Sequence, residues 1–121
     1  LVWLDADAWG EGGVVPAFGP EGNAARSFGL GFDIFNNGEV NNNHLSVHYD
    51  GVKLAEFANP GFDLANGQFN HARVVLERAS GGAFVTVSLT PAGGEVVTPI
   101  ANYFVSGLDL RDARLGFAAY S

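Results

Sequence analysis

Residues 29–50 read GLGFDIFNNGEVNNNHLSVHYD, and this stretch indicates the fold more clearly than any other. In its first part, Leu30, Phe32 and Ile34 would share one face of an extended strand, and the residues between them would share the other. An asparagine-rich segment follows. It ends at His44, where a second alternating run begins and places Leu45 and every second residue after it inward. The pattern predicts two β-strands joined by a polar loop.

Asp33 is the residue in this stretch that most needs a partner. A carboxylate between Phe32 and Ile34 is costly to desolvate unless hydrogen-bond donors or a cation satisfy it. The polar residues that follow it and could do so are Asn36, Asn37, Glu39, Asn41, Asn42, Asn43 and His44. The sequence therefore predicts an oxygen-rich site at the rim of a β-sheet.

The remainder of the chain alternates between short apolar runs and turn signals, with Asp50-Gly51 a strong hairpin signal. Seventeen glycines and ten phenylalanines agree with many short strands. We expect no long helix, and residues 109–114 could form one helical turn at most. The expected strands are residues 1–4, 14–18, 27–35, 44–49, 52–57, 69–78, 83–90, 96–105 (interrupted at Pro99) and 113–120. Strands at this spacing predict an all-β fold, an antiparallel β-sandwich or jelly roll.

Length and composition exclude several classes of protein. The 121 residues fit a single domain spanning residues 1–121, and the lack of cysteine excludes disulfides and thiol chemistry. A formal charge of −7 argues against a nucleic-acid partner. No apolar run is long enough to insert into a membrane. Because the chain does not begin with methionine, we expect a processed product or a segment of a longer protein.

Several motifs together resemble the core of a legume-type (L-type) lectin domain, in the concanavalin A-like lectin/glucanase class. They are FDIFNNG, NNNHLSVHYDG, FDLANGQFNHARVVL, VTVSLTP and IANYFVSGLDLRDARLGFAAYS, in this order. The resemblance covers about the last three-quarters of the chain and implies a concanavalin A-like jelly roll. Complete domains of this family are longer. The chain would thus be a partial or bacterial-type member. It would be a minimal version of the domain, a sandwich completed by other domains or chains, or a segment cut from a larger protein.

The resemblance also implies a site, residue by residue. Asp33 matches a metal-ligand aspartate, Phe35 an aromatic whose carbonyl binds calcium and whose ring stacks on sugar, and Asn37 an amide that contacts both. His44 matches a transition-metal ligand. Gly31 replaces the family's glutamate, however, and the aspartate that bridges the two metals has no clear counterpart, with Glu39 or Asn41 nearest. We therefore expect no transition-metal site, whereas Asp33, Phe35, Asn37 and Glu39 or Asn41 could still bind calcium.

Each of these residues has a simpler interpretation. Asp33 and the asparagines could cap turns by accepting backbone hydrogen bonds. His44 and His48 are too far apart on one strand to bind one ion and are expected at the surface. Trp3 is expected in the core, whereas Trp9, in a glycine-rich stretch, could stack on sugar.

Enzyme activity is not expected. Glucanases need two carboxylates that reach one cleft, and the acidic pair Asp5 and Asp7 runs into a loop. Ser27 and Ser46 lack a nucleophile elbow and a convincing histidine partner.

Two functions remain. The first is a non-catalytic carbohydrate-binding module, secreted or at the cell surface, that binds glycan through Asn37, Phe35, Asp33, Gly12, Gly13 and Trp9. The second is a structural or adhesive sandwich domain that has lost sugar binding.

Overall fold

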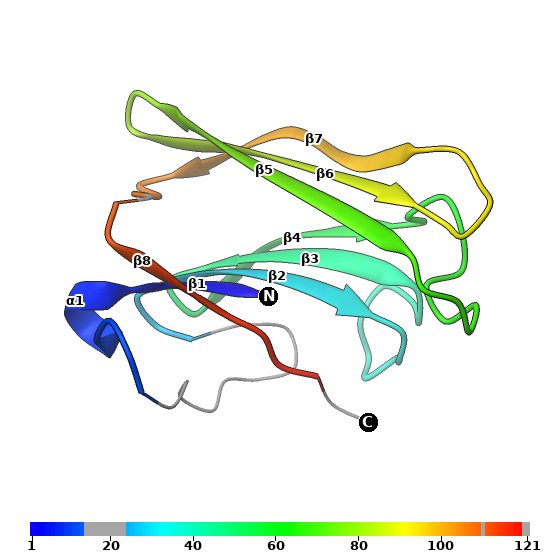
Figure 1. Cartoon of the computed structure of the whole chain (residues 1–121), viewed down its shortest axis with the longest axis horizontal. Coiled ribbons are helices and arrows are strands. Elements are labelled where there is room, and N and C mark those ends of the chain that lie inside the picture. Colours follow the sequence, from blue (N-terminus) through cyan, green and yellow to red (C-terminus); the bar gives the residue numbers. More distant parts are fainter. Residues whose placement is uncertain (14–23, 110, 120–121) are drawn as a thin grey trace. The chain divides into compact units, whose positions relative to one another are not determined.

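The computed structural model describes residues 1–13, 24–109 and 111–119 and is all-β with two antiparallel sheets, as expected (Figure 1). One sheet has the strand order β4-β3-β2-β1-β8, and the other has the order β5-β6-β7. The elements are β1 (Val2–Asp5), α1 (Ala6–Trp9), β2 (Ser27–Asp33), β3 (His44–Tyr49), β4 (Val52–Ala58), β5 (His71–Ala79), β6 (Gly82–Thr90), β7 (Val97–Ser106) and β8 (Ala113–Gly116).

The chain forms two compact units. The first unit comprises Leu1–Gly31, Ser46–Glu56 and Leu110–Ser121, and the second comprises Phe32–Leu45 and Phe57–Asp109. The first unit holds β1, β8 and most of β2, β3 and β4, whereas the second holds β5, β6 and β7 together with the two loops at residues 34–43 and 59–70.

In the first unit, β1 lies between β2 and β8 and is antiparallel to both. Val2 pairs with Gly29 on one side and with Gly116 on the other. The alternation of β1 buries Val2 and Leu4 completely. Trp3 is only partly buried, against our expectation of a core residue, and its ring packs on Phe28 at 5.3 Å between centroids.

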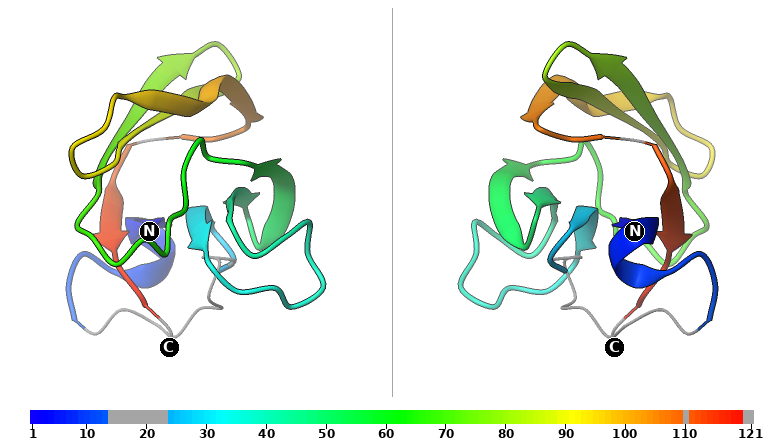
Figure 2. Two further views of the ribbon diagram at one scale, coloured as in Figure 1. Left: turned by 90° about the vertical axis from the view of Figure 1, so that its right-hand side faces the viewer. Right: turned by 90° about the vertical axis from the view of Figure 1, so that its left-hand side faces the viewer.

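The second sheet is built from two hairpins around β6 (Figure 2 shows its twist). Ala83, Val85, Val87 and Leu89 share one buried face of β6, as their spacing predicts. The register between β6 and β7 shifts twice, between Val85 and Val87 and between Val87 and Leu89. The second shift accommodates Pro99, so that β7 continues through the proline instead of being interrupted there.

Most of the expected strands are confirmed to within two residues. The Asp50-Gly51 hairpin is also confirmed, with positive φ at both residues. One local expectation was wrong, because Asp5 caps a one-turn helix, α1, where a loop was expected. Residues 109–114, for which the expectation was one helical turn at most, contain no helix among those described. β8 ends at Gly116, earlier than expected. The strand expected at residues 14–18 lies outside the described residues.

Candidate functional site

Asp33 is the last residue of β2 and is partly exposed. Its Oδ1 accepts a hydrogen bond from the backbone N–H of Phe35 at 2.6 Å, which makes a tight Asx turn. Phe32 and Ile34 are 38% and 55% exposed. The alternation inferred from the sequence therefore stops at the strand end, and the carboxylate does not lie in an apolar interior.

The loop of residues 34–43, called here the asparagine loop, consists of consecutive local turns. Asn36 Oδ1 accepts from the N–H of Gly38 at 2.8 Å. Glu39 Oε2 accepts from the N–H of Asn37 at 2.9 Å. Asn41 Oδ1 accepts from the N–H of Asn43, also at 2.9 Å. These bonds fix the backbone of the loop and leave the side chains of Phe35, Asn36 and Asn37 exposed.

His44 is completely buried, and His48 is only 3% exposed. The expectation that both histidines lie at the surface was therefore wrong. Simple alternation assigns one face of β3 to solvent, but both faces of this strand are buried. The Nδ1 of His44 lies 2.9 Å from the carbonyl oxygen of Asn41 and donates to it, because a carbonyl can only accept. Its Nε2 is buried and has no hydrogen-bond partner among the described residues.

The structure brings the expected metal ligands together in neighbouring pairs: Asp33 with Phe35, Asn37 with Glu39, and Asn41 with His44. Among the described residues, no cluster of three or more His, Cys, Asp or Glu side chains could hold a metal ion. Calcium bound through carbonyl and amide oxygens stays a prediction. The oxygen-rich character of the loop fits a hard cation, whereas the buried ring of His44 is already oriented by the Asn41 carbonyl.

A second loop, residues 59–70, is joined to the asparagine loop and is called here the phenylalanine loop. The side chain of Asn43 connects them, because its Nδ2 donates to the carbonyl of Phe62 and its Oδ1 accepts from the N–H of Leu64, each at 2.9 Å. Both loops are on the right in Figure 1. Phe69 is fully exposed in this loop. Sequence reasoning assigned Phe69 to a strand and missed it, although the preceding Asn-Gly turn was recognised.

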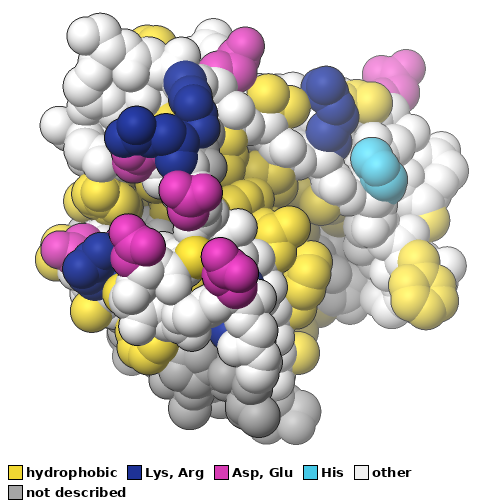
Figure 3. Space-filling model, turned by 60° about the vertical axis from the view of Figure 1, so that its left-hand side comes forward, with side chains coloured by type: hydrophobic (Ala, Val, Ile, Leu, Met, Phe, Trp, Pro, Cys, Tyr) yellow, Lys and Arg dark blue, Asp and Glu magenta, His cyan; other side chains and the backbone are white. Residues whose placement is uncertain are grey.

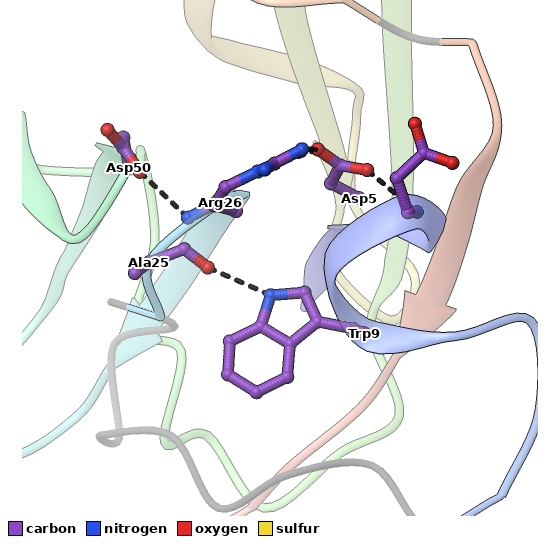
Figure 4. A network of polar contacts seen from close by, with 6 residues as sticks. Asp5, Trp9, Ala25, Arg26 and Asp50 are labelled. Carbon is purple, nitrogen blue, oxygen red and sulfur yellow. Dashed lines mark hydrogen bonds and ion pairs between the residues drawn. The ribbon is translucent and has the colours of Figure 1, made fainter.

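The expected site residues Trp9, Gly12 and Gly13 belong to the first unit, where they have structural contacts. Trp9 packs against Val2 and Leu4, and its indole N–H donates to the carbonyl of Ala25 at 2.9 Å (Figure 4). Their expected role in sugar binding stays a prediction.

The guanidinium of Arg114, on β8, organises the glycine-rich stretch that follows α1. It donates to the carbonyl of Gly12 at 2.8 Å and to the carbonyl of Gly13. It also approaches the carbonyls of Trp9 and Gly10 at 3.3 and 3.5 Å. One cation therefore holds the backbone of this stretch through its carbonyl oxygens.

Arg26 also connects segments of the first unit (Figure 4). Its guanidinium forms an ion pair with Asp5, and its backbone N–H donates to Asp50 Oδ1 at 2.8 Å. The hydrogen bond from Arg26 lowers the pKa of the Asp5 carboxyl. The Asp5 carboxylate thus has a local structural role, because it also caps α1 by accepting from the N–H of Asp7 at 2.9 Å.

Ser46 does have a histidine partner, which the sequence analysis missed. Its Oγ lies 3.0 Å from His48 Nε2, because residues two apart on a strand share a face. Both side chains are buried, because Ser46 is 0% exposed and His48 is 3% exposed. The interior position gives the pair a role in satisfying buried polar groups.

On the face shown in Figure 3, acidic side chains lie beside the basic ones. Within the described residues, no helix is long and apolar enough to span a membrane. Comparisons of the chain with protein-family models, curated proteins and solved structures find no match.

Proposed function

We propose that the chain is a non-catalytic, lectin-like carbohydrate-binding domain, secreted or displayed at a cell surface, that binds glycan on the asparagine loop. The observation that supports this most directly is the presentation of Phe35, 69% exposed, next to the exposed amides of Asn36 and Asn37. An aromatic face packs on the apolar face of a pyranose ring, while amides both donate to and accept from hydroxyl groups.

The fixed backbone of the loop also supports binding. The Asx turns at Asp33, Asn36 and Asn41 hold the loop before any ligand arrives. A loop that is already ordered loses less conformational entropy on binding. Calcium would add to this order by binding the carboxylate of Asp33, the carbonyl of Phe35 and the amide of Asn37.

A structural or adhesive domain without sugar affinity is the second candidate. It is favoured by the turns themselves, because Asp33 Oδ1 and Glu39 Oε2 already accept backbone hydrogen bonds. In that case the oxygen-rich loop is a set of capped turns, and its exposed residues serve no ligand.

The two candidates are separated by screening the protein on a glycan array with calcium and with chelator, followed by calorimetry on any saccharide that binds. We expect binding that Phe35→Ala and Asn37→Ala each weaken by about tenfold, which corresponds to the loss of one aromatic or hydrogen-bonded contact. Phe117→Ala is the matched control, because Phe117 is also an exposed phenylalanine (77%) but belongs to the first unit. Absence of saccharide binding in both buffers would favour the structural candidate.

A further inference from the structure

The phenylalanine loop repeats the chemistry of the asparagine loop. Each contains one exposed phenylalanine, Phe35 in one and Phe69 in the other, with exposed fractions of 69% and 103%. Each also contains an Asn-Gly dipeptide, Asn37-Gly38 in the first and Asn66-Gly67 in the second. The two loops belong to the same compact unit and are joined by the Asn43 side chain.

Phe69 is exposed on a loop that is held in place. Asn66 and Asn70 exchange side-chain hydrogen bonds at 3.1 Å, and Asn66 Oδ1 also accepts from the N–H of Gln68 at 2.9 Å. Asn70 Oδ1 accepts from the N–H of Ala92, at the turn between β6 and β7, at 3.2 Å. Burial of an apolar ring of this size is favourable, and Phe69 gains none of that stabilisation within the chain itself.

Each Asn-Gly turn has open space at its glycine. A Cβ atom added at Gly38 or at Gly67 would meet no heavy atom within 4 Å. Both glycines have positive φ, +103° and +71°. Each glycine therefore leaves its side of the turn open to a ligand.

Charge indicates the class of ligand. Residues 32–45 and 57–70 contain the carboxylates Asp33, Glu39 and Asp63 but no lysine or arginine. An anionic ligand would be repelled and would find no cation to pair with. Exposed aromatic rings with amide side chains and no basic residue suit an uncharged, hydroxyl-rich ligand.

We propose that the phenylalanine loop is a second saccharide subsite, in which Phe69 packs on a sugar ring and Gln68 and Asn66 hydrogen-bond its hydroxyls. The ligand of this domain is then a neutral oligosaccharide that occupies both loops, not a single sugar. The inference rests on the proposed carbohydrate-binding function and specifies its ligand.

The test is calorimetry of the whole chain with uncharged glucose, mannose and galactose oligosaccharides of one to five units. We expect the wild-type protein to bind longer oligosaccharides more tightly than the monosaccharide. Phe69→Ala should lose about two- to tenfold in affinity for the longer oligosaccharides and nothing for the monosaccharide, whereas Phe35→Ala should weaken both. Gly67→Asn should act like Phe69→Ala, because asparagine tolerates the positive φ but its side chain fills the open space at the turn.

The outcomes distinguish this proposal from the proposed function. If the wild-type protein binds saccharide and Phe69→Ala leaves the dependence on chain length unchanged, the second subsite is wrong and the carbohydrate-binding function stands. Preference for an acidic oligosaccharide on the glycan array described above would also overturn the subsite proposal. If no saccharide binds at all, both proposals fail. Circular dichroism of each variant establishes that the fold is intact, which is expected because Phe69 and Gly67 lie in an exposed loop.

Discussion

The side chain of His48 is neutral in the folded protein at neutral pH, because burial lowers its pKa from 6.5 to about 4. The positive charge of Lys53 acts in the same direction, and the negative charge of Glu56 opposes it. In the unfolded chain, His48 takes up a proton below about pH 6.5, whereas in the folded chain it does so only near pH 4. The unfolded state therefore binds more protons between these two values.

We predict that the free energy of unfolding falls as the pH drops from 6.5 to 4, with His48 contributing about 1–3 kcal/mol of the loss. Urea unfolding at several pH values measures this. The variant His48→Gln, which keeps a polar side chain near Ser46, isolates the contribution, since the carboxylates titrate alike in both proteins. Equal pH dependence in the two proteins would contradict the assignment to His48.

For individual residues, the sequence predicted the Asx turns but not the burial of His44 and His48. Asp33 and Asn41 cap turns as their residue type suggests, because their oxygens reach the N–H two residues ahead. The burial of His44 depends on what covers the second face of β3, and alternation within one strand carries no such information. Phe69 was missed for a similar reason. An apolar residue next to a strand is assigned to it unless the strand end is known, and β5 begins only at His71.

Gly82, the first residue of β6, shows how closely two strands approach each other in the second sheet. A Cβ atom placed there would lie 2.2 Å from the carbonyl oxygen of Val105 on β7 and 2.9 Å from the ring of Phe104. The backbone oxygen cannot move without disturbing the ladder between β6 and β7. Gly82 is therefore required by sterics, not by turn geometry.

We predict that Gly82→Ala lowers the free energy of unfolding by about 2–3 kcal/mol, the cost of forcing atoms into a packed position. Its neighbour Gly81 gives the control, since it has φ +76° and open space around its Cα. Gly81→Asn should cost less than about 1 kcal/mol, because asparagine tolerates left-handed backbone. Urea midpoints at unchanged m-value compare the two, and a similar loss in both variants would refute the steric explanation.

The strands themselves were largely predictable, because apolar alternation and turn residues are local properties. The Asp50-Gly51 turn shows this well, with φ values of 51° and 79° where the sequence placed a hairpin. The continuity of β7 through Pro99 was not predictable, since it depends on bulges that are defined only by pairing with β6. The helix α1 was missed because a single turn, capped by Asp5, has too few residues to show a period.

For the whole molecule, the excess of acidic residues sets its colloidal behaviour. The formal charge of −7 keeps molecules apart at neutral pH, and it vanishes near the sequence pI of about 4.6. Exposed apolar side chains such as Leu115 and Phe117 then meet without electrostatic opposition.

We predict that the protein self-associates increasingly as the pH approaches 4.6, as measured by light scattering at constant ionic strength. The same increase is expected in His48→Gln, which separates loss of net charge from protonation of the buried histidine. A scattering intensity that stays constant down to pH 4.6 would contradict the prediction.

The pairing of β1 with both β2 and β8 affects how the chain can fold during synthesis. Val2 leaves the ribosome more than a hundred residues before its partner Gly116. The hairpins β5-β6-β7, which pair only with near neighbours in sequence, can assemble while translation is still under way. One edge of β1 stays unpaired until β8 has been translated, so a product truncated before β8 would expose that edge to other nascent chains.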